Sequence, residues 1–301
     1  MSSPFSPQVE RIEMDELVCW RIRTSSAELL VAQQGAQLLH YQRDGERPLL
    51  WLSEQAAFRR GHSVRGGVPV CWPWFGALER NPQAVQALYR GSAAPAHGLV
   101  RNLDWELEEV EAKHDAVDLQ FALHRPAQGL PDWPHAADLR LHIHLDERLH
   151  LSLINHNKGS QPLHISQALH SYFAIGDIRH ACVRGLAGLR YIETLENWEE
   201  RPQQGELNFT GETDRIYLQV PEQLCILDGA WQRRIHLPSS GSRSAVVWNP
   251  WVDKSQRLSQ FAADAWQRML CIETANVLDD ALQLAPGETR SLTLSLWSEP
   301  L

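Results

Sequence analysis

The stretch Leu139-Arg-Leu-His-Ile-His-Leu-Asp-Glu-Arg-Leu-His-Leu-Ser-Leu153 carries the clearest structural signal in the chain. Leucine or isoleucine occupies every second position on both sides of the polar Asp146-Glu147-Arg148, so each half has one apolar and one polar face. This alternation predicts a β-hairpin with a short turn at residues 146–148.

The same alternation recurs along the chain at residues 117–123, 216–220 and 292–296, and a further strand is expected over Trp105 to Glu109. Asp44-Gly45 and Asp228-Gly229 supply residues that tolerate a positive φ in tight turns between strands. Helical spacing is confined to Ser255–Met269, which predicts one or two short helices. We therefore expect an all-β protein, a large antiparallel β-sandwich with long loops and a few short helices. We expect a single domain over residues 1–301, with a flexible tail at 1–8.

Composition narrows the classes of function. The chain has 301 residues, of which 43% are hydrophobic and 12 are Trp, enough to bury a sizeable core. Its formal net charge of -9 argues against nucleic acid as a partner, because such binders need excess Lys and Arg. The 5 cysteines form no C-x-x-C pair, which favours a reducing compartment. No signal peptide and no long apolar run is apparent, so we expect a cytoplasmic protein that does not enter a membrane.

Two segments in the first third of the chain are rich in Gly, Pro, aromatic and ionisable residues. The first is RGGVPVCWPWFG at 65–76, where paired glycines allow close backbone approach and Trp74 and Phe75 offer aromatic faces to a sugar. The second, HGLVRNLDW at 97–105, places His97 and Arg101 in a short polar stretch. The alternatives are a rigid turn filled by core aromatics and an ordinary loop histidine.

Two further segments carry candidate acid–base groups. His170 lies between apolar neighbours in LHSYF and is expected to be partly buried, and Glu273 lies inside the apolar CIETANV. A buried carboxylate needs a partner, so Glu273 is either functional or paired with an Arg. Asp214 of TDRIY adds a second carboxylate, or else belongs to a solvated hairpin edge. The histidines at positions 150, 156 and 164 lack zinc-ligand spacing, and no metal site is predicted.

These groups together fit an enzyme that binds a polyol and moves protons. Taken in chain order, RGGVPVCWPWFG, AHGLVRN, ALHSYF, TDRIY, WNPW and CIETANV also resemble the glucose-6-phosphate 1-epimerase branch of the aldose 1-epimerase superfamily. The resemblance spans roughly residues 27–296. It implies a galactose-mutarotase-like sandwich without a required metal or organic cofactor. It also implies a small-molecule hexose phosphate as the substrate, and we expect a monomer.

The resemblance assigns roles by position. It implies that His170 is the general acid, that Glu273 is the general base, and that His97 holds the ring oxygen or its neighbouring hydroxyl. Asp214 would bind ring hydroxyls. The remaining predicted substrate-binding residues are Arg65 and Arg101, as partners of a 6-phosphate, with Trp74 and Phe75. Free-aldose mutarotases carry their pocket Arg in an asparagine-containing segment that is missing here, which favours a phosphorylated substrate.

The expected chemistry is ring opening and reclosure at the anomeric carbon. Ionised Glu273 would take the C1 hydroxyl proton and cationic His170 would protonate the ring oxygen, with Asp214 helping to keep His170 charged. The alternatives are a non-catalytic sugar-binding module, a mutarotase of unphosphorylated aldoses, and a glycoside hydrolase, which also uses carboxylates.

Overall fold

The computed structural model describes residues 6–123 and 129–301. Most of the predicted tail at residues 1–8 lies outside this range, but Gln8 already begins the first strand, so that prediction extends too far. Within the described residues every strand pairing is antiparallel and the strands form two large sheets and two smaller ones, as expected for an antiparallel β-sandwich.

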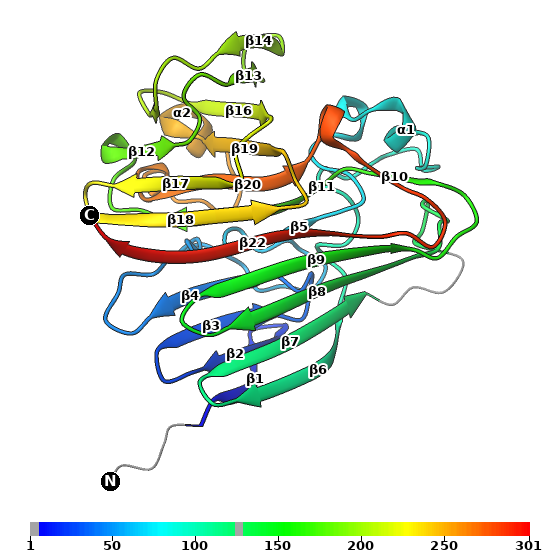
Figure 1. Cartoon of the computed structure of the whole chain (residues 1–301), viewed down its shortest axis with the longest axis horizontal. Coiled ribbons are helices and arrows are strands. Elements are labelled where there is room, and N and C mark those ends of the chain that lie inside the picture. The colour runs from blue at the N-terminus through cyan, green and yellow to red at the C-terminus, as the bar shows by residue number, and fades with distance from the viewer. Residues whose placement is uncertain (1–5, 124–128) are drawn as a thin grey trace.

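One layer of the sandwich is a nine-stranded sheet that crosses the front of Figure 1. The predicted hairpin is confirmed: its two strands pair from Leu145 and Leu149 outward, and their leucines and isoleucine are buried. In sheet order the strands are β15 (Leu207–Asn208), β12 (Ala181–Arg184), β17 (Gln223–Asp228), β18 (Arg233–Ser240), β22 (Thr289–Pro300), β9 (Leu149–Asn157), β8 (Ala137–Leu145), β7 (Ala116–Leu123) and β6 (Glu106–Lys113).

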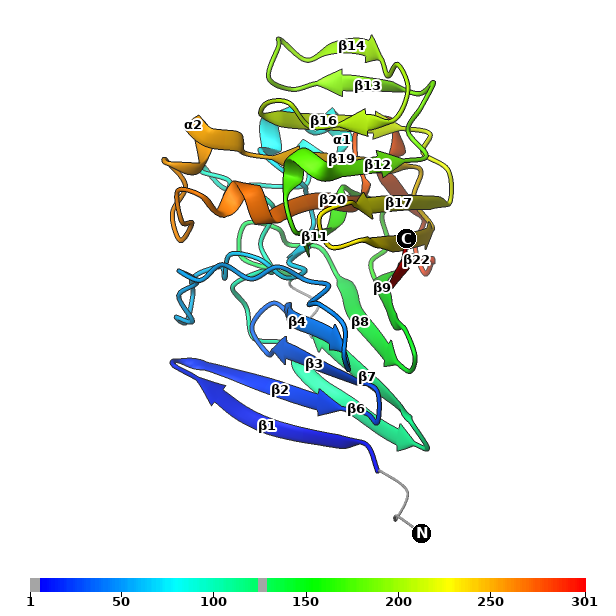
Figure 2. The ribbon, with the colours of Figure 1, turned by 90° about the vertical axis from the view of Figure 1, so that its left-hand side faces the viewer.

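The second layer consists of two sheets that cover different halves of the first, the four-stranded one below and the seven-stranded one above (Figure 2). The four-stranded sheet contains β1 (Gln8–Met14), β2 (Leu17–Arg23), β3 (Ala27–Ala32) and β4 (Leu38–Arg43). The seven-stranded sheet contains, in order, β14 (Glu199–Pro202), β13 (Arg190–Glu193), β16 (Thr213–Leu218), β19 (Ser244–Asn249), β20 (Met269–Asn276), β11 (Gln167–Ala174) and β5 (Val70–Cys71).

The remaining elements are short. A two-stranded sheet joins β10 (Leu163–Ile165) to β21 (Leu282–Leu284). The α-helices are α1 (Gln83–Gln86) and α2 (Trp251–Ser255), and the 3₁₀ helices are η1 (Leu78–Arg80), η2 (Ile178–His180), η3 (Ala265–Arg268) and η4 (Leu278–Asp280). Over residues 6–123 and 129–301, no helix has the length and apolar character needed to span a membrane.

The helix predicted for Ser255–Met269 is largely wrong, because α2 ends at Ser255 and only Ala265–Arg268 form a further helical turn. Ser255 Oγ donates to the carbonyls of Val252 and Ala263 and so stabilises the chain where it leaves the helix. The apolar residues at helical spacing serve separate contacts instead: the ring centroid of Phe261 lies 5.3 Å from that of Trp51. The spacing of these apolar residues alone did not distinguish separately buried side chains from one face of a helix.

Two smaller sequence predictions also need correction. The strand expected at Trp105 starts at Glu106, and Val220 lies beyond the end of β16. Gly45 has the positive φ expected of a turn glycine, but Gly229 does not. A Cβ at Gly229 would lie 2.9 Å from the carbonyl oxygen of His180, so glycine there permits a close backbone approach.

The two faces of the seven-stranded sheet have different roles. Leu169 and Phe173 of β11 and Ile272 of β20 belong to the main hydrophobic cluster, together with leucines of the nine-stranded sheet. Residues at the alternate positions of β11, β20, β19 and β16 face the other way, because side chains of a strand alternate between its faces. That second face is the floor of a pocket.

Candidate active site

The floor of the pocket is built from two rows of side chains that cross four adjacent strands. Strand register places His170, Glu273, Val246 and Ile216 in one row, on β11, β20, β19 and β16. In the neighbouring row Tyr172, Trp248 and Asp214 line the pocket, whereas Cys271 is fully buried between Tyr172 and Trp248. Residues more than a hundred positions apart in sequence thus become direct neighbours through antiparallel pairing.

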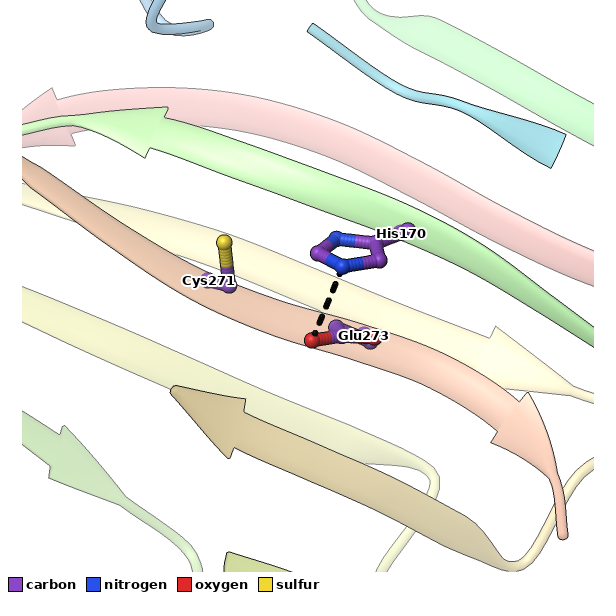
Figure 3. A group of neighbouring side chains, drawn as sticks. All are labelled: His170, Cys271 and Glu273. Carbon is purple, nitrogen blue, oxygen red and sulfur yellow. Dashed lines mark ion pairs between the residues drawn. The ribbon is translucent and has the colours of Figure 1, made fainter. Parts of the chain in front are cut away.

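His170 and Glu273 face each other across the β11–β20 pair. His170 Nε2 lies 3.4 Å from Glu273 Oε1, and their side chains are 10% and 3% exposed (Figure 3). The partner that Glu273 needs is therefore a histidine rather than an Arg. The imidazole stacks on the ring of Tyr172 at 4.8 Å with an interplanar angle of 6°, which holds its orientation.

Burial sets the protonation of this pair. It lowers the pKa of the His170 imidazole well below its ordinary value, and nearby His97, Arg101 and Arg65 lower it further. Burial also raises the pKa of the Glu273 carboxyl well above its ordinary value, and the charge of Asp214 adds to that rise. Both directions favour a protonated Glu273 beside a neutral His170. The expectation that Asp214 keeps His170 charged is wrong, since Asp214 acts on Glu273.

His97 reaches the pocket from a loop and is neutral. Burial, followed by the charges of Arg101 and Arg65, lowers the pKa of its imidazole to about 3. The backbone N–H of Gly76 donates to His97 Nδ1 at 3.4 Å, which leaves the ring proton on Nε2. His97 lies 5.4 Å from His170 between ring centroids and can therefore donate a hydrogen bond close to the catalytic pair.

Loops form the walls of the pocket, which has a volume of about 470 Å³, a size suited to a single sugar. Of the residues proposed from sequence, the lining contains Arg65, Phe75, His97, His170, Asp214 and Glu273. Arg65 Nη1 donates to the hydroxyl of Tyr172 at 3.4 Å. Burial raises the pKa of Asp214 to about 6, against its ordinary value of 3.8.

Arg101 and Trp74 do not line this pocket. Arg101 donates through Nη2 to the carbonyl of Ala96 at 2.7 Å, in the same loop as His97. It therefore acts on His97 and His170 through its charge. Trp74 is 1% exposed and donates through Nε1 to the carbonyl of Pro95, so it belongs to the core, in agreement with the alternative interpretation of its segment.

Sequence reasoning missed several pocket residues, notably the cations Arg80 and Lys254 and the aromatic Trp198. The guanidinium of Arg80 lies 4.9 Å from the centroid of the Trp198 ring and is held there by a cation–π contact. Arg80 follows the WPWFG segment, and Lys254 follows the WNPW segment, by only a few residues, which were the available signals. Trp198 comes from a segment that carries no motif of its own.

An acid–base pair on the floor of an aromatic-walled pocket, on one face of a β-sandwich, defines an enzyme that moves protons on a small polyol. A family model described as aldose 1-epimerase matches residues 18–297. The chain belongs to this family. It is accordingly an isomerase that interconverts the anomers of an aldose, and the family and fold predicted from sequence are confirmed.

Individual relatives are consistent with this assignment. A "Putative glucose-6-phosphate 1-epimerase" of Escherichia coli (strain K12) is 35% identical over 90% of this chain and 87% of its own length. One of the same name from Cenchrus ciliaris is 31% identical over 96% of this chain and 86% of its own length. Among solved structures, a "putative mutarotase (YeaD)" from Salmonella typhimurium matches with a TM-score of 0.87 and 28% identity, covering 97% of this chain and 94% of its own. A galactose mutarotase-like protein from Clostridium acetobutylicum shares the fold, with a TM-score of 0.76 at 15% identity over 98% and 99% of the two chains.

Proposed function

We propose that this enzyme interconverts the α and β anomers of an aldohexose 6-phosphate, with D-glucose 6-phosphate as the first candidate. The observation that carries the proposal is the contact of 3.4 Å between His170 Nε2 and Glu273 Oε1 on the pocket floor. Two titratable groups at this distance can act on the C1 hydroxyl and the ring oxygen of one bound pyranose. The names of the relatives support the choice of sugar.

In the proposed mechanism, ionised Glu273 accepts the C1 hydroxyl proton while cationic His170 donates a proton to the ring oxygen. The bond between C1 and the ring oxygen breaks, its electrons pass to the ring oxygen, and C1 becomes an aldehyde. Rotation about C1–C2 and the reverse proton transfers close the ring on its other face. Ring opening leaves Glu273 protonated and His170 neutral, which is the state that burial favours. In the empty pocket the ionised pair is therefore the minor form, and the mechanism requires that it forms when the sugar binds.

The 6-phosphate requires cations that face the pocket. We propose Arg65 and Arg80 for this role, with Lys254 as a further positive charge, in place of the expected pair of Arg65 and Arg101. An Arg offers bidentate hydrogen bonds to a phosphate, and Arg80 is already held over Trp198. His97, Asp214 and Phe75 remain as the residues proposed to hold the sugar ring and its hydroxyls.

The decisive experiment is anomer exchange measured by magnetisation-transfer NMR on glucose 6-phosphate, glucose and galactose. We expect the fastest exchange with the phosphorylated sugar. Glu273→Gln and His170→Asn should each lower the exchange rate about 10²- to 10⁴-fold while glucose 6-phosphate still binds, as seen by quenching of tryptophan fluorescence. Unchanged rates in both variants would remove the pair from the mechanism, and equal rates on all three sugars would remove the phosphate from the proposal.

A separate experiment tests whether Arg80 binds the 6-phosphate. Arg80→Ala should lower kcat/KM for glucose 6-phosphate by about 10- to 100-fold, the value of a charge-assisted hydrogen bond, and leave exchange of free glucose unchanged. Arg60→Ala is the control, because Arg60 is exposed and pairs with Asp104 rather than lining the pocket. An equal loss of kcat/KM on both sugars would show that Arg80 does not bind the phosphate.

The proposed substrate also indicates the compartment in which the enzyme works. We propose a monomeric enzyme of the cytoplasm, where free thiols such as the five cysteines persist and phosphorylated sugars are available. Size-exclusion chromatography with light scattering tests the monomer, and a mass near twice 34.2 kDa would contradict it.

A further inference from the structure

Cys271 is a buried nucleophilic side chain beside the pocket floor that the proposed chemistry leaves unused. It precedes Glu273 by two positions on β20, so its thiol projects from the same face of the sheet. The register places it between Tyr172 on β11 and Trp248 on β19, whose ring centroids lie 6.2 Å apart in an edge-to-face contact. The thiol is fully buried between these two rings and does not itself line the pocket.

The thiol lies close to both catalytic groups. One ligand atom each from His170, Cys271 and Glu273 can be chosen so that all three lie within 4.8 Å of one another. Figure 3 shows the thiol and the carboxylate rising from β20 beside the imidazole from β11. Ligand atoms of a tetrahedral zinc ion are about 3.3–3.8 Å apart, given bond lengths of about 2.0–2.3 Å, so a contraction of at most about 1.5 Å would complete the geometry.

The same groups have unused lone pairs. His170 Nδ1 and Glu273 Oε2 are buried and have no hydrogen-bond partner among the residues that the structure describes. Buried polar atoms without a hydrogen-bond partner are uncommon, and a bound ligand, water or ion is one explanation for them. They belong to residues that together offer one sulfur, one nitrogen and one oxygen donor, the atom types that bind zinc in proteins.

We propose that His170, Cys271 and Glu273 form an inhibitory site for a thiophilic divalent cation, of which Zn²⁺ is the representative. Binding forms a metal–thiolate bond and releases the thiol proton, together with the carboxyl proton where present, to the solvent. The imidazole and the carboxylate then hold the metal and can no longer exchange protons with the sugar. The inhibition rests on the proposed function of the pair, whereas the binding does not.

Co²⁺ titration of the full chain tests the binding directly. Wild type should develop the near-ultraviolet thiolate-to-cobalt charge-transfer absorption, and Zn²⁺ should abolish it. Cys271→Ala should lack this band, while a Cys182→Ser/Cys225→Ser double variant should keep it. The control removes the two cysteines that are only partly buried and leaves the pocket intact.

Anomer exchange with added Zn²⁺ tests the inhibition. With each exchange rate normalised to the metal-free rate of the same protein, the half-inhibitory Zn²⁺ concentration of Cys271→Ala should be at least about tenfold higher than that of wild type. That figure is a lower bound, because loss of even an outer partner of a ligand costs about 10- to 100-fold in metal affinity. Cys271→Ser serves the same purpose should the alanine variant fail to fold.

Several results would overturn the proposal: no cobalt band in wild type, a band retained in the Cys271 variants, or loss of the band in the Cys182/Cys225 control. Equal zinc sensitivity of wild type and the Cys271 variants would also overturn it. If wild type shows no anomer exchange at all, the proposed function fails, but the cobalt band still decides the metal site.

Discussion

Asp214 is a carboxyl that lines the pocket. Burial raises its pKa to about 6, against an ordinary value of 3.8. The folded protein therefore binds this proton more tightly than the unfolded chain, and the carboxyl's contribution to stability falls as the pH rises from about 4 to about 6. We predict that Asp214→Asn removes this fall, which amounts to at most about 3 kcal/mol of unfolding free energy.

Urea unfolding of wild type and Asp214→Asn at pH 4 and pH 7 measures the effect. The difference in unfolding free energy between the two proteins should shift in favour of Asp214→Asn at the higher pH. Asp253→Asn is the matched control, because Asp253 is an exposed carboxylate in α2, beside the pocket residue Lys254. A constant difference across the two pH values would mean that Asp214 is not desolvated in the folded protein.

Trp74 and Phe75 are adjacent in sequence but differ in what they contact. Trp74 is buried against Tyr89 in an edge-to-face contact at 4.9 Å, whereas Phe75 lines the pocket beside His97. We predict that Trp74→Ala lowers the unfolding free energy by about 3–5 kcal/mol, as expected for a large buried aromatic, without changing the preference between sugars. Phe75→Ala should instead raise KM with a smaller loss of stability. If Trp74→Ala altered sugar preference at unchanged stability, Trp74 would have to contact the substrate.

At the scale of elements, the loop that carries His97 is fixed to the sheet by a glycine. Gly98 has a φ of +78°, a Cβ there would lie 2.0 Å from the carbonyl oxygen of Trp72, and the N–H of Leu99 donates to that same oxygen at 2.8 Å. We predict that Gly98→Ala displaces this loop and lowers both kcat/KM and the melting temperature. An added side chain here meets backbone atoms that cannot move aside.

Gly188 provides the matched comparison, because its φ is +81° but no atom of the described residues lies within 4 Å of the position that a Cβ would take. Gly188→Ala should lose about 1–2 kcal/mol from the positive φ alone and keep full activity. Calorimetry and anomer exchange on both variants separate the cost of the positive φ from the cost of the clash with the backbone of Trp72. Equal behaviour of the variants would show that close packing against Trp72 does not position the loop.

The elements differ in how far sequence alone could predict them. The β8–β9 hairpin was recognisable because one of its faces is only partly buried, which preserves the alternation of apolar and polar residues. The strands β11 and β20 are buried along their whole length, so their sequences show no alternation, and His170 and Glu273 were marked instead by their apolar neighbours and by motif resemblance. The wall residues Arg80, Trp198 and Lys254 come from the short helix η1, a turn and the helix α2, and how these separate segments meet depends on the packing of the whole fold.

At the scale of the whole molecule, one buried ion pair connects three of the sheets. Arg233, at the start of β18 in the nine-stranded sheet, lies 3.3 Å from Asp228 Oδ2, and the two side chains are 7% and 0% exposed. Its Nη2 also donates to the carbonyl of Ala174, at the end of β11 in the seven-stranded sheet. Further donations reach the carbonyls of Arg47 and Pro48, in the segment that follows β4 of the four-stranded sheet.

We predict that Arg233→Met lowers the unfolding free energy by about 3–5 kcal/mol, because it leaves the Asp228 carboxylate buried without its charge partner and three carbonyls without their donor. The adjacent Arg234 pairs with Glu299 at 3.3 Å, but the two side chains are 37% and 46% exposed. Arg234→Met should therefore cost less than about 1 kcal/mol. Guanidinium unfolding monitored by tryptophan fluorescence compares the two variants, and similar losses would mean that the buried pair does not hold the sheets together. Activity in buffer should be preserved in both variants, since neither Arg233 nor Arg234 lines the pocket.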